Sequence, residues 1–121
     1  MSEKLVFMVT KGPADAELVT FPFMMAAAAL ASDVEVVMGF QGDAVELVRR
    51  GGVDGVQAPE FPPLAKLIDS VRELGGKLLL CSPCLKSRGI AFPDDVIDGT
   101  EVVAAARFVA EITSATNSLV Y

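Results

Sequence analysis

The chain has 121 residues, the length of one domain of ordinary size, and 52% of them are hydrophobic. Its formal net charge is −6, from 10 basic and 16 acidic residues, so a basic face that follows nucleic-acid phosphates is not expected. The sequence contains no histidine. This excludes Ser-His-Asp and Cys-His catalysis within one chain, and it excludes histidine as a metal ligand.

An apolar segment at residues 21–31 imitates part of a secretion signal, because it ends in the small-residue pattern ALA at 29–31. Asp15 and Glu17 precede it, however, where such a signal carries positive charge. The segment is also shorter than the roughly 20 residues that a membrane-spanning helix needs. We therefore predict a buried helix in a cytoplasmic protein without membrane contact.

The first half of the chain is predicted to alternate strands with helices. Residues 4–10 form a continuous apolar run, typical of a strand buried on both faces. A helix follows over 15–32, with Asp15 as its cap and an apolar surface nearly all round, so it should be buried in the domain or in a subunit interface. Residues 34–40 form the second strand, 41–43 a turn and 44–50 a short helix.

The second half continues this alternation. Its predicted elements are a helix over 62–74, a strand over 77–81, a loop over 82–90, a strand over 101–104, a helix over 105–116 and a last strand over 118–121. The loop over 82–90 leaves room for a turn of helix from Cys84. Strands that alternate with helices form a mostly parallel sheet covered on both faces. The predicted fold class is therefore α/β, with residues 1–121 as a single-domain three-layer sandwich around a five-stranded, flavodoxin-like sheet.

Both cysteines of the chain lie in the segment CSPC at 81–84, where the third predicted strand ends. Ligands of open parallel sheets bind at the carboxyl ends of the strands, where the strand order reverses. In a flavodoxin-like order, 2-1-3-4-5, this point lies between strands one and three. The loop at Lys11 and Gly12, which follows strand one, should then face Cys81 across a crevice.

A thiol in this position is expected to ionise readily. Helix N-termini and backbone N–H groups at the strand ends stabilise a thiolate, and Lys86 and Arg88 follow closely with positive charge. We therefore predict that the pKa of the reactive cysteine lies below its ordinary value.

Three interpretations of Cys81 and Cys84 are open. Both can be buried structural residues. Together they can supply two of the four ligands of a zinc site, but the chain has no other cysteine and no histidine to complete it. No metal is therefore predicted. The spacing favours the third interpretation, which is thiol redox or sulfur-transfer chemistry without an organic cofactor.

Six segments in order along the chain form a recognisable set. They are TKGPAD at 10–15, FPF at 21–23, PPL at 62–64, CSPCLKSRGI at 81–90, IDG at 97–99 and SLVY at 118–121. With this set the chain resembles the DsrE/DsrF-like family of small sulfur-handling proteins, which includes the sulfur-relay subunits of tRNA thiolation. The resemblance covers nearly the whole length, and the cysteine loop is its most specific part.

The resemblance implies a homo-oligomer, a trimer or a hexamer, in which Cys81 holds the position of the family's sulfur-carrying cysteine. The tRNA-thiolation members have no cysteine at the position of Cys84, whereas other members carry the pair. We expect Lys11 and Gly12, together with Ser82, Lys86 and Arg88, to orient an anionic sulfur donor.

The predicted function is sulfur relay, in which a cysteine persulfide accepts sulfane sulfur and passes it to an acceptor thiol. The expected partners are sulfur donor and acceptor proteins or small sulfur anions. Two alternatives remain, a dithiol redox or sensor protein and a non-catalytic oligomeric binding subunit. Whether the protein acts as a sulfurtransferase or only as a carrier is left open by the sequence.

Overall fold

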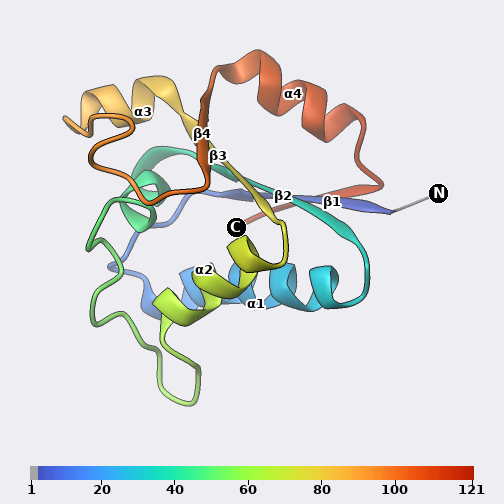
Figure 1. Cartoon of the computed structure of the whole chain (residues 1–121), viewed down its shortest axis with the longest axis horizontal. Coiled ribbons are helices and arrows are strands. Elements are labelled where there is room, and N and C mark those ends of the chain that lie inside the picture. The colour runs from blue at the N-terminus through green and yellow to red at the C-terminus, as the bar shows by residue number, and fades with distance from the viewer. Residues whose placement is uncertain (1–2) are drawn as a thin grey trace.

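The computed structural model describes residues 3–121 and has a five-stranded sheet with helices on both faces (Figure 1). The strands are β1 (Lys4–Val9), β2 (Glu35–Phe40), β3 (Lys77–Cys81), β4 (Thr100–Val103) and β5 (Asn117–Val120). The helices are α1 (Ala16–Ala31), the 3-10 helix η1 (Gly42–Leu47), α2 (Leu64–Glu73), α3 (Ser82–Ser87) and α4 (Ala105–Thr113). The predicted α/β class and the five-stranded sheet are confirmed.

The strand order is β4-β3-β2-β1-β5, and every neighbouring pair is parallel. The flavodoxin-like order 2-1-3-4-5 is therefore wrong. β2 lies between β1 and β3, so the ends of those two strands do not border a common crevice. Both orders use the same alternation of strands and helices, and for this reason the local sequence pattern could not separate them.

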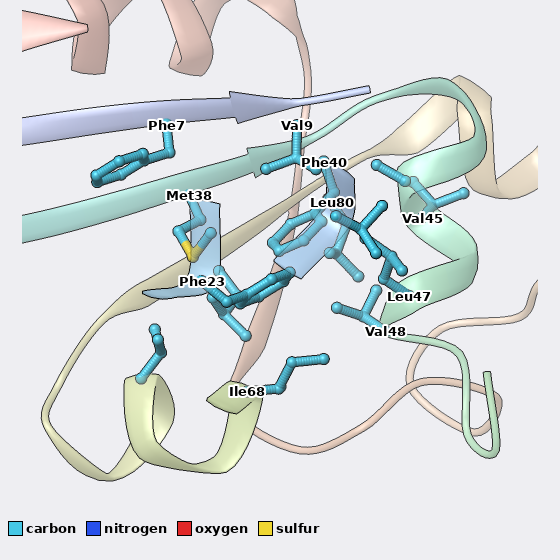
Figure 2. Packing of buried hydrophobic residues seen from close by; sticks show 14 of the residues in the cluster. Phe7, Val9, Phe23, Met38, Phe40, Val45, Leu47, Val48, Ile68 and Leu80 are labelled. Carbon is cyan, nitrogen blue, oxygen red and sulfur yellow. The ribbon is translucent and has the colours of Figure 1, made fainter. Parts of the chain in front are cut away.

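The larger core lies between the sheet and the layer of α1 and α2, as Figure 2 shows from close by. The strand residues alternate between the two faces, so every second apolar side chain enters this core. Its members include Phe7, Val9, Met38, Phe40 and Leu80 from the strands, Phe23 from α1, Ile68 from α2, and Val45, Leu47 and Val48 from η1 and the residue after it. The rings of Phe23 and Phe40 stack with centroids 5.9 Å apart, which joins α1 to the centre of the sheet.

The opposite face of the sheet carries a smaller core beneath α4. Val6, Met8 and Leu79 of the strands pack there with Phe108 of α4. Gly39 makes this packing possible, because a Cβ at that position would lie 2.6 Å from Met8 Sδ and 2.7 Å from Phe108 Cε1. The continuous apolar runs of the central strands thus follow from burial on both faces.

Ion pairs attach α4 to the sheet. Lys4 Nζ of β1 lies 2.6 Å from Glu111 Oε1, and Arg107 Nε lies 2.7 Å from Glu111 Oε2. Arg107 also reaches Glu101 of β4, with 2.8 Å between Nη1 and Oε2. The side chains of Lys4 and Glu111 are only 14% and 13% exposed, so water screens this pair less than an ordinary surface pair.

The surface of α1 that faces away from the sheet is apolar. Leu18 and Met25 are each 49% exposed and Met24 is 38% exposed, while Val19 and Phe23 are buried. The α1 helix is therefore only half covered in a single chain, and the homo-oligomer remains a prediction. Asp15 precedes α1 as expected, but its side chain makes no capping hydrogen bond.

Within residues 3–121, none of the helices combines the length and the apolar character that crossing a membrane requires.

The Glu111 pairs predict a pH-dependent stability. Lys4 and Arg107 hold the pKa of Glu111 below its ordinary value of 4.5, since both donate hydrogen bonds to the carboxylate. A carboxylate whose folded pKa is lowered stabilises the fold above its unfolded pKa and loses this contribution as pH falls through the folded value. We expect Glu111→Gln to lower the free energy of unfolding by about 1–3 kcal/mol at pH 7, and by less as pH falls through the folded pKa.

Urea unfolding at a series of pH values measures this difference, with Glu73→Gln, at an exposed position in α2, as the matched control. A difference between wild type and Glu111→Gln that stays constant from pH 7 to pH 3 would contradict the assignment.

Candidate functional site

The two cysteines lie where β3 passes directly into α3. Cys81 is the last residue of β3. The predicted loop begins with the six-residue helix α3, which starts at Ser82, two residues before the helical turn considered from Cys84. Pro83 stands in its first turn, where proline suits a helix because the N–H that it lacks has no intrahelical partner. This turn brings Cys84 back over the strand end. The two half-buried sulfurs lie 2.7 Å apart as free thiols.

The sulfur of Cys84 accepts a hydrogen bond from the backbone N–H of Gly42, with 3.2 Å between nitrogen and sulfur. Gly42 is the first residue of η1 and has φ of +57°, in the left-handed region that favours glycine. The turn after β2 therefore directs a backbone donor at Cys84, on the helix that follows the neighbouring strand β3.

Arg88 joins α3 to η1. Its Nη2 lies 2.8 Å from Asp43 Oδ1, and its Nη1 donates a 3.2 Å hydrogen bond to the carbonyl of Cys84. Arg88 was predicted to bind the donor anion, but its charge is already paired with Asp43. Gly42 and Asp43 are the residues that sequence reasoning missed, and the only signal for them was a glycine in the turn directly after a strand.

Gly12 is buried against Asp43. A Cβ at position 12 would lie 2.9 Å from Asp43 Cβ and 3.0 Å from the Asp43 carbonyl oxygen. The loop after β1 thus contacts the site through η1, and not across a crevice between strands one and three. Lys11, which precedes Gly12, is exposed.

Ser82 and Lys86 lie one turn apart on α3 and face a separate hollow. This hollow has a volume of about 330 Å³ and is otherwise lined mainly by apolar side chains, among them Leu85, Ile90 and Phe92. Neither cysteine is part of its lining. The structure therefore places the predicted site residues in two groups, with the thiols and Arg88 beside η1 and with Ser82 and Lys86 on the hollow.

The predicted lowering of the Cys81 pKa is wrong. Burial raises the pKa of the Cys81 thiol above its ordinary value, and the hydrogen bond to Cys84 raises it further, while the charge of Arg88 opposes this only weakly. A backbone hydrogen bond from Cys84, in the first turn of α3, and the charge of Arg88 both lower the pKa of Cys81. Burial of the thiol is the largest effect, and it outweighs them because desolvation disfavours the thiolate.

Among residues 3–121, the acidic and cysteine side chains form no group of three or more that could hold a metal ion.

The profile of the DsrE/DsrF-like family matches residues 3–121. The chain belongs to this family. Its match takes in the whole sheet, both thiols and the η1 turn that contacts them, so the resemblance seen in the sequence is confirmed at the level of the family.

Among curated proteins, this chain is similar to the protein MJ0760 of Methanocaldococcus jannaschii. The two are 29% identical over 106 residues, which cover 88% of this chain but 38% of MJ0760. The chain therefore spans well under half of that relative's length.

Solved structures show the same fold at low sequence identity. The YchN protein of E. coli superposes with a TM-score of 0.79 at 21% identity, covering 98% of this chain and 99% of YchN. The protein MTH1491 of Methanobacterium thermoautotrophicum gives 0.76 at 16% identity, covering 99% and 100% of the two chains. BT1422 of Bacteroides thetaiotaomicron gives 0.70 at 15% identity, covering 98% and 95%. The DsrE-like fold of this family member is therefore established.

The contact between Gly12 and Asp43 predicts the effect of one methyl group. We expect Gly12→Ala to push Asp43 away and to lower the free energy of unfolding by about 1–3 kcal/mol, as overpacking of a buried contact does. Urea unfolding measures the change, with Lys11→Ala as the control, since an exposed side chain is expected to contribute within about 0.5 kcal/mol. Equal urea midpoints for Gly12→Ala and wild type would show that the contact is loose.

Proposed function

We propose that this DsrE/DsrF-like protein relays sulfur through the thiol pair of Cys81 and Cys84. One thiolate accepts a sulfane sulfur from a donor and holds it as a persulfide, and an acceptor thiol then takes it. The donors and acceptors that fit this chemistry are small sulfur anions, such as thiosulfate and polysulfides, and the persulfides and thiols of partner proteins.

The observation that carries the proposal is the position of two half-buried free thiols, 2.7 Å apart, at the carboxyl end of a parallel strand. This is the end of the sheet at which open α/β proteins bind their ligands. Partial burial keeps the sulfurs within reach of a small donor while it limits the access of water to a bound persulfide. Membership of the family supports the same chemistry.

The transfer needs no oxidant beyond the donor. With thiosulfate, a cysteine thiolate attacks the outer sulfur, the sulfur–sulfur bond of thiosulfate breaks, and sulfite leaves with the electron pair. The product is a cysteine persulfide, and the total charge is unchanged. Delivery to an acceptor thiol is the same type of exchange with the protein as the leaving group.

A second candidate, dithiol redox or sensing, is favoured by the same sulfur–sulfur distance. A small movement of either side chain would bring the sulfurs into bonding distance, and an intramolecular disulfide requires a pair that is already close. The two candidates differ in their products. Relay adds sulfur to the protein, whereas dithiol oxidation removes two hydrogen atoms and adds nothing.

Intact-protein mass spectrometry after exposure to thiosulfate or polysulfide tests the proposal. We expect the reduced wild type to gain one or more sulfur atoms, cyanide to remove them, and the double variant Cys81→Ser/Cys84→Ser to gain none. The double variant is a matched control because serine keeps the approximate size of each side chain while it removes the nucleophilic sulfur.

Two results would contradict sulfur relay. A loss of two hydrogens without any gain of sulfur would support the dithiol redox function. An unchanged mass in wild type would leave a non-catalytic binding subunit.

A further inference from the structure

The turn after β2 and the helix after β3 are joined by three hydrogen bonds beside the thiols. The backbone N–H of Gly42 donates to Cys84 Sγ, with 3.2 Å between nitrogen and sulfur. Arg88 supplies the other two, since its Nη2 donates to Asp43 Oδ1 at 2.8 Å and its Nη1 donates to the Cys84 carbonyl oxygen at 3.2 Å. Because Gly42 and Asp43 are neighbours in the chain, Cys84 is held to one short segment through both its side chain and its backbone.

We call the two hydrogen bonds from Arg88 the Arg88 bridge. Its end at Asp43 is supported by Gly12, because a Cβ at position 12 would lie 2.9 Å from Asp43 Cβ. The side chain of Asp43 is 74% exposed and that of Arg88 is 28% exposed, so the ion pair by itself would contribute little. What makes the contact specific is the second N–H group of the same guanidinium, which reaches the backbone of Cys84.

The two sulfurs are close for atoms that are not bonded. Cys81 Sγ and Cys84 Sγ lie 2.7 Å apart, only about 0.7 Å more than the length of a disulfide bond. Cys81 is fixed as the last residue of β3, whereas Cys84 belongs to the six-residue helix α3, which is too short to be stable by itself. Buried Leu85 attaches this helix to the core, and the Arg88 bridge attaches it to η1. The place of Cys84 beside Cys81 therefore depends on these attachments.

We propose that Arg88 and Asp43 are positioning residues for Cys84. Their bridge keeps the Cys84 sulfur against the Gly42 N–H and within reach of Cys81. The bridge acts through the place of α3, without contact to the sulfur donor or to the transferred sulfur. This goes beyond the proposed function, because sulfur relay and dithiol redox chemistry both use the proximity of the thiols, and that proximity can be measured without any sulfur donor.

Equilibrium with glutathione measures the proximity. Glutathione disulfide oxidises the pair to an intramolecular disulfide, and the two thiol protons leave on two molecules of glutathione. The ratio of closed to open protein at a known glutathione ratio gives the effective concentration of one thiol at the other. A contact that only stabilises the folded chain contributes equally to both forms and leaves this ratio unchanged. A contact that holds the two sulfurs together raises it.

Four variants separate the geometry of the bridge from its charge. We expect Asp43→Ala to lower the effective concentration about threefold to tenfold, as the loss of a partly exposed, charged hydrogen bond does. Alanine keeps the Cβ that packs against Gly12, and Asp43→Asn, which retains an acceptor oxygen, should lose less. Arg88→Lys keeps the charge but lacks the planar fork that reaches both partners, so it should resemble Arg88→Ala.

Two further variants complete the comparison. Glu46→Ala is the matched control, because it removes another ion pair of η1, with 3.2 Å between Glu46 Oε1 and Nη1 of Arg49, a residue outside α3. Its effective concentration should equal that of wild type. The double variant Asp43→Ala/Arg88→Ala should differ from wild type no more than the single variants do, since all three remove the same bridge.

Amide hydrogen exchange at Gly42 follows the hydrogen bond to sulfur directly. We expect the Gly42 N–H to exchange faster in reduced Asp43→Ala than in reduced wild type, while the amides of the central strands keep their rates and show that the fold is intact. An effective concentration that is unchanged or increased in both Asp43→Ala and Arg88→Ala would overturn the proposal. Wild type that forms no intramolecular disulfide with glutathione would overturn it as well.

The glutathione measurement also separates this proposal from the proposed function. If wild type gains no sulfur from polysulfide but the bridge variants lower the effective concentration, sulfur relay fails and the positioning role stands. If wild type relays sulfur and the variants leave the effective concentration unchanged, sulfur relay stands and the positioning role is wrong.

Discussion

The hydrogen bond from the Gly42 N–H to the Cys84 sulfur connects the two elements on which the site depends, the turn after β2 and the helix after β3. It can form only because β2 and β3 are neighbours in the sheet, so that their carboxyl ends lie side by side. The Asp43–Arg88 ion pair also joins the turn after β2 to the end of α3. Gly12 then supports Asp43 from the loop after β1. The ends of three neighbouring strands thus meet beside the thiol pair.

Most of the fold could be predicted from local patterns. The continuous apolar runs of the central strands follow from burial between α1 and α2 on one face and α4 on the other. The place of Cys81 at the end of β3 was also predictable, because a buried strand that runs into a C-x-x-C segment leaves its first thiol at the carboxyl end of the strand. These features depend on residues close together in the chain, and periodicity records them directly.

The strand order and the surroundings of the thiols depend on residues far apart in the chain, and they could not be predicted. The strand order is set by how helices pack across the sheet, and the same alternation of elements is compatible with more than one order. The wrong order placed Lys11 and Gly12 opposite Cys81 and left Gly42 unnoticed in a turn. The expected lowering of the Cys81 pKa failed for a related reason, since sequence shows the positive charges of Lys86 and Arg88 but not the burial of the sulfur or the pairing of Arg88 with Asp43.

The central claim is that the protein hands sulfur on, and the most direct test follows one sulfur atom from protein to acceptor. Wild-type protein is loaded with polysulfide, separated from the donor by gel filtration and mixed with a small thiol, and both species are followed by mass spectrometry. The account predicts that the protein returns to its reduced mass while the acceptor gains the sulfur. Release of the sulfur as hydrosulfide, with a Cys81–Cys84 disulfide left on the protein and no gain by the acceptor, would contradict it.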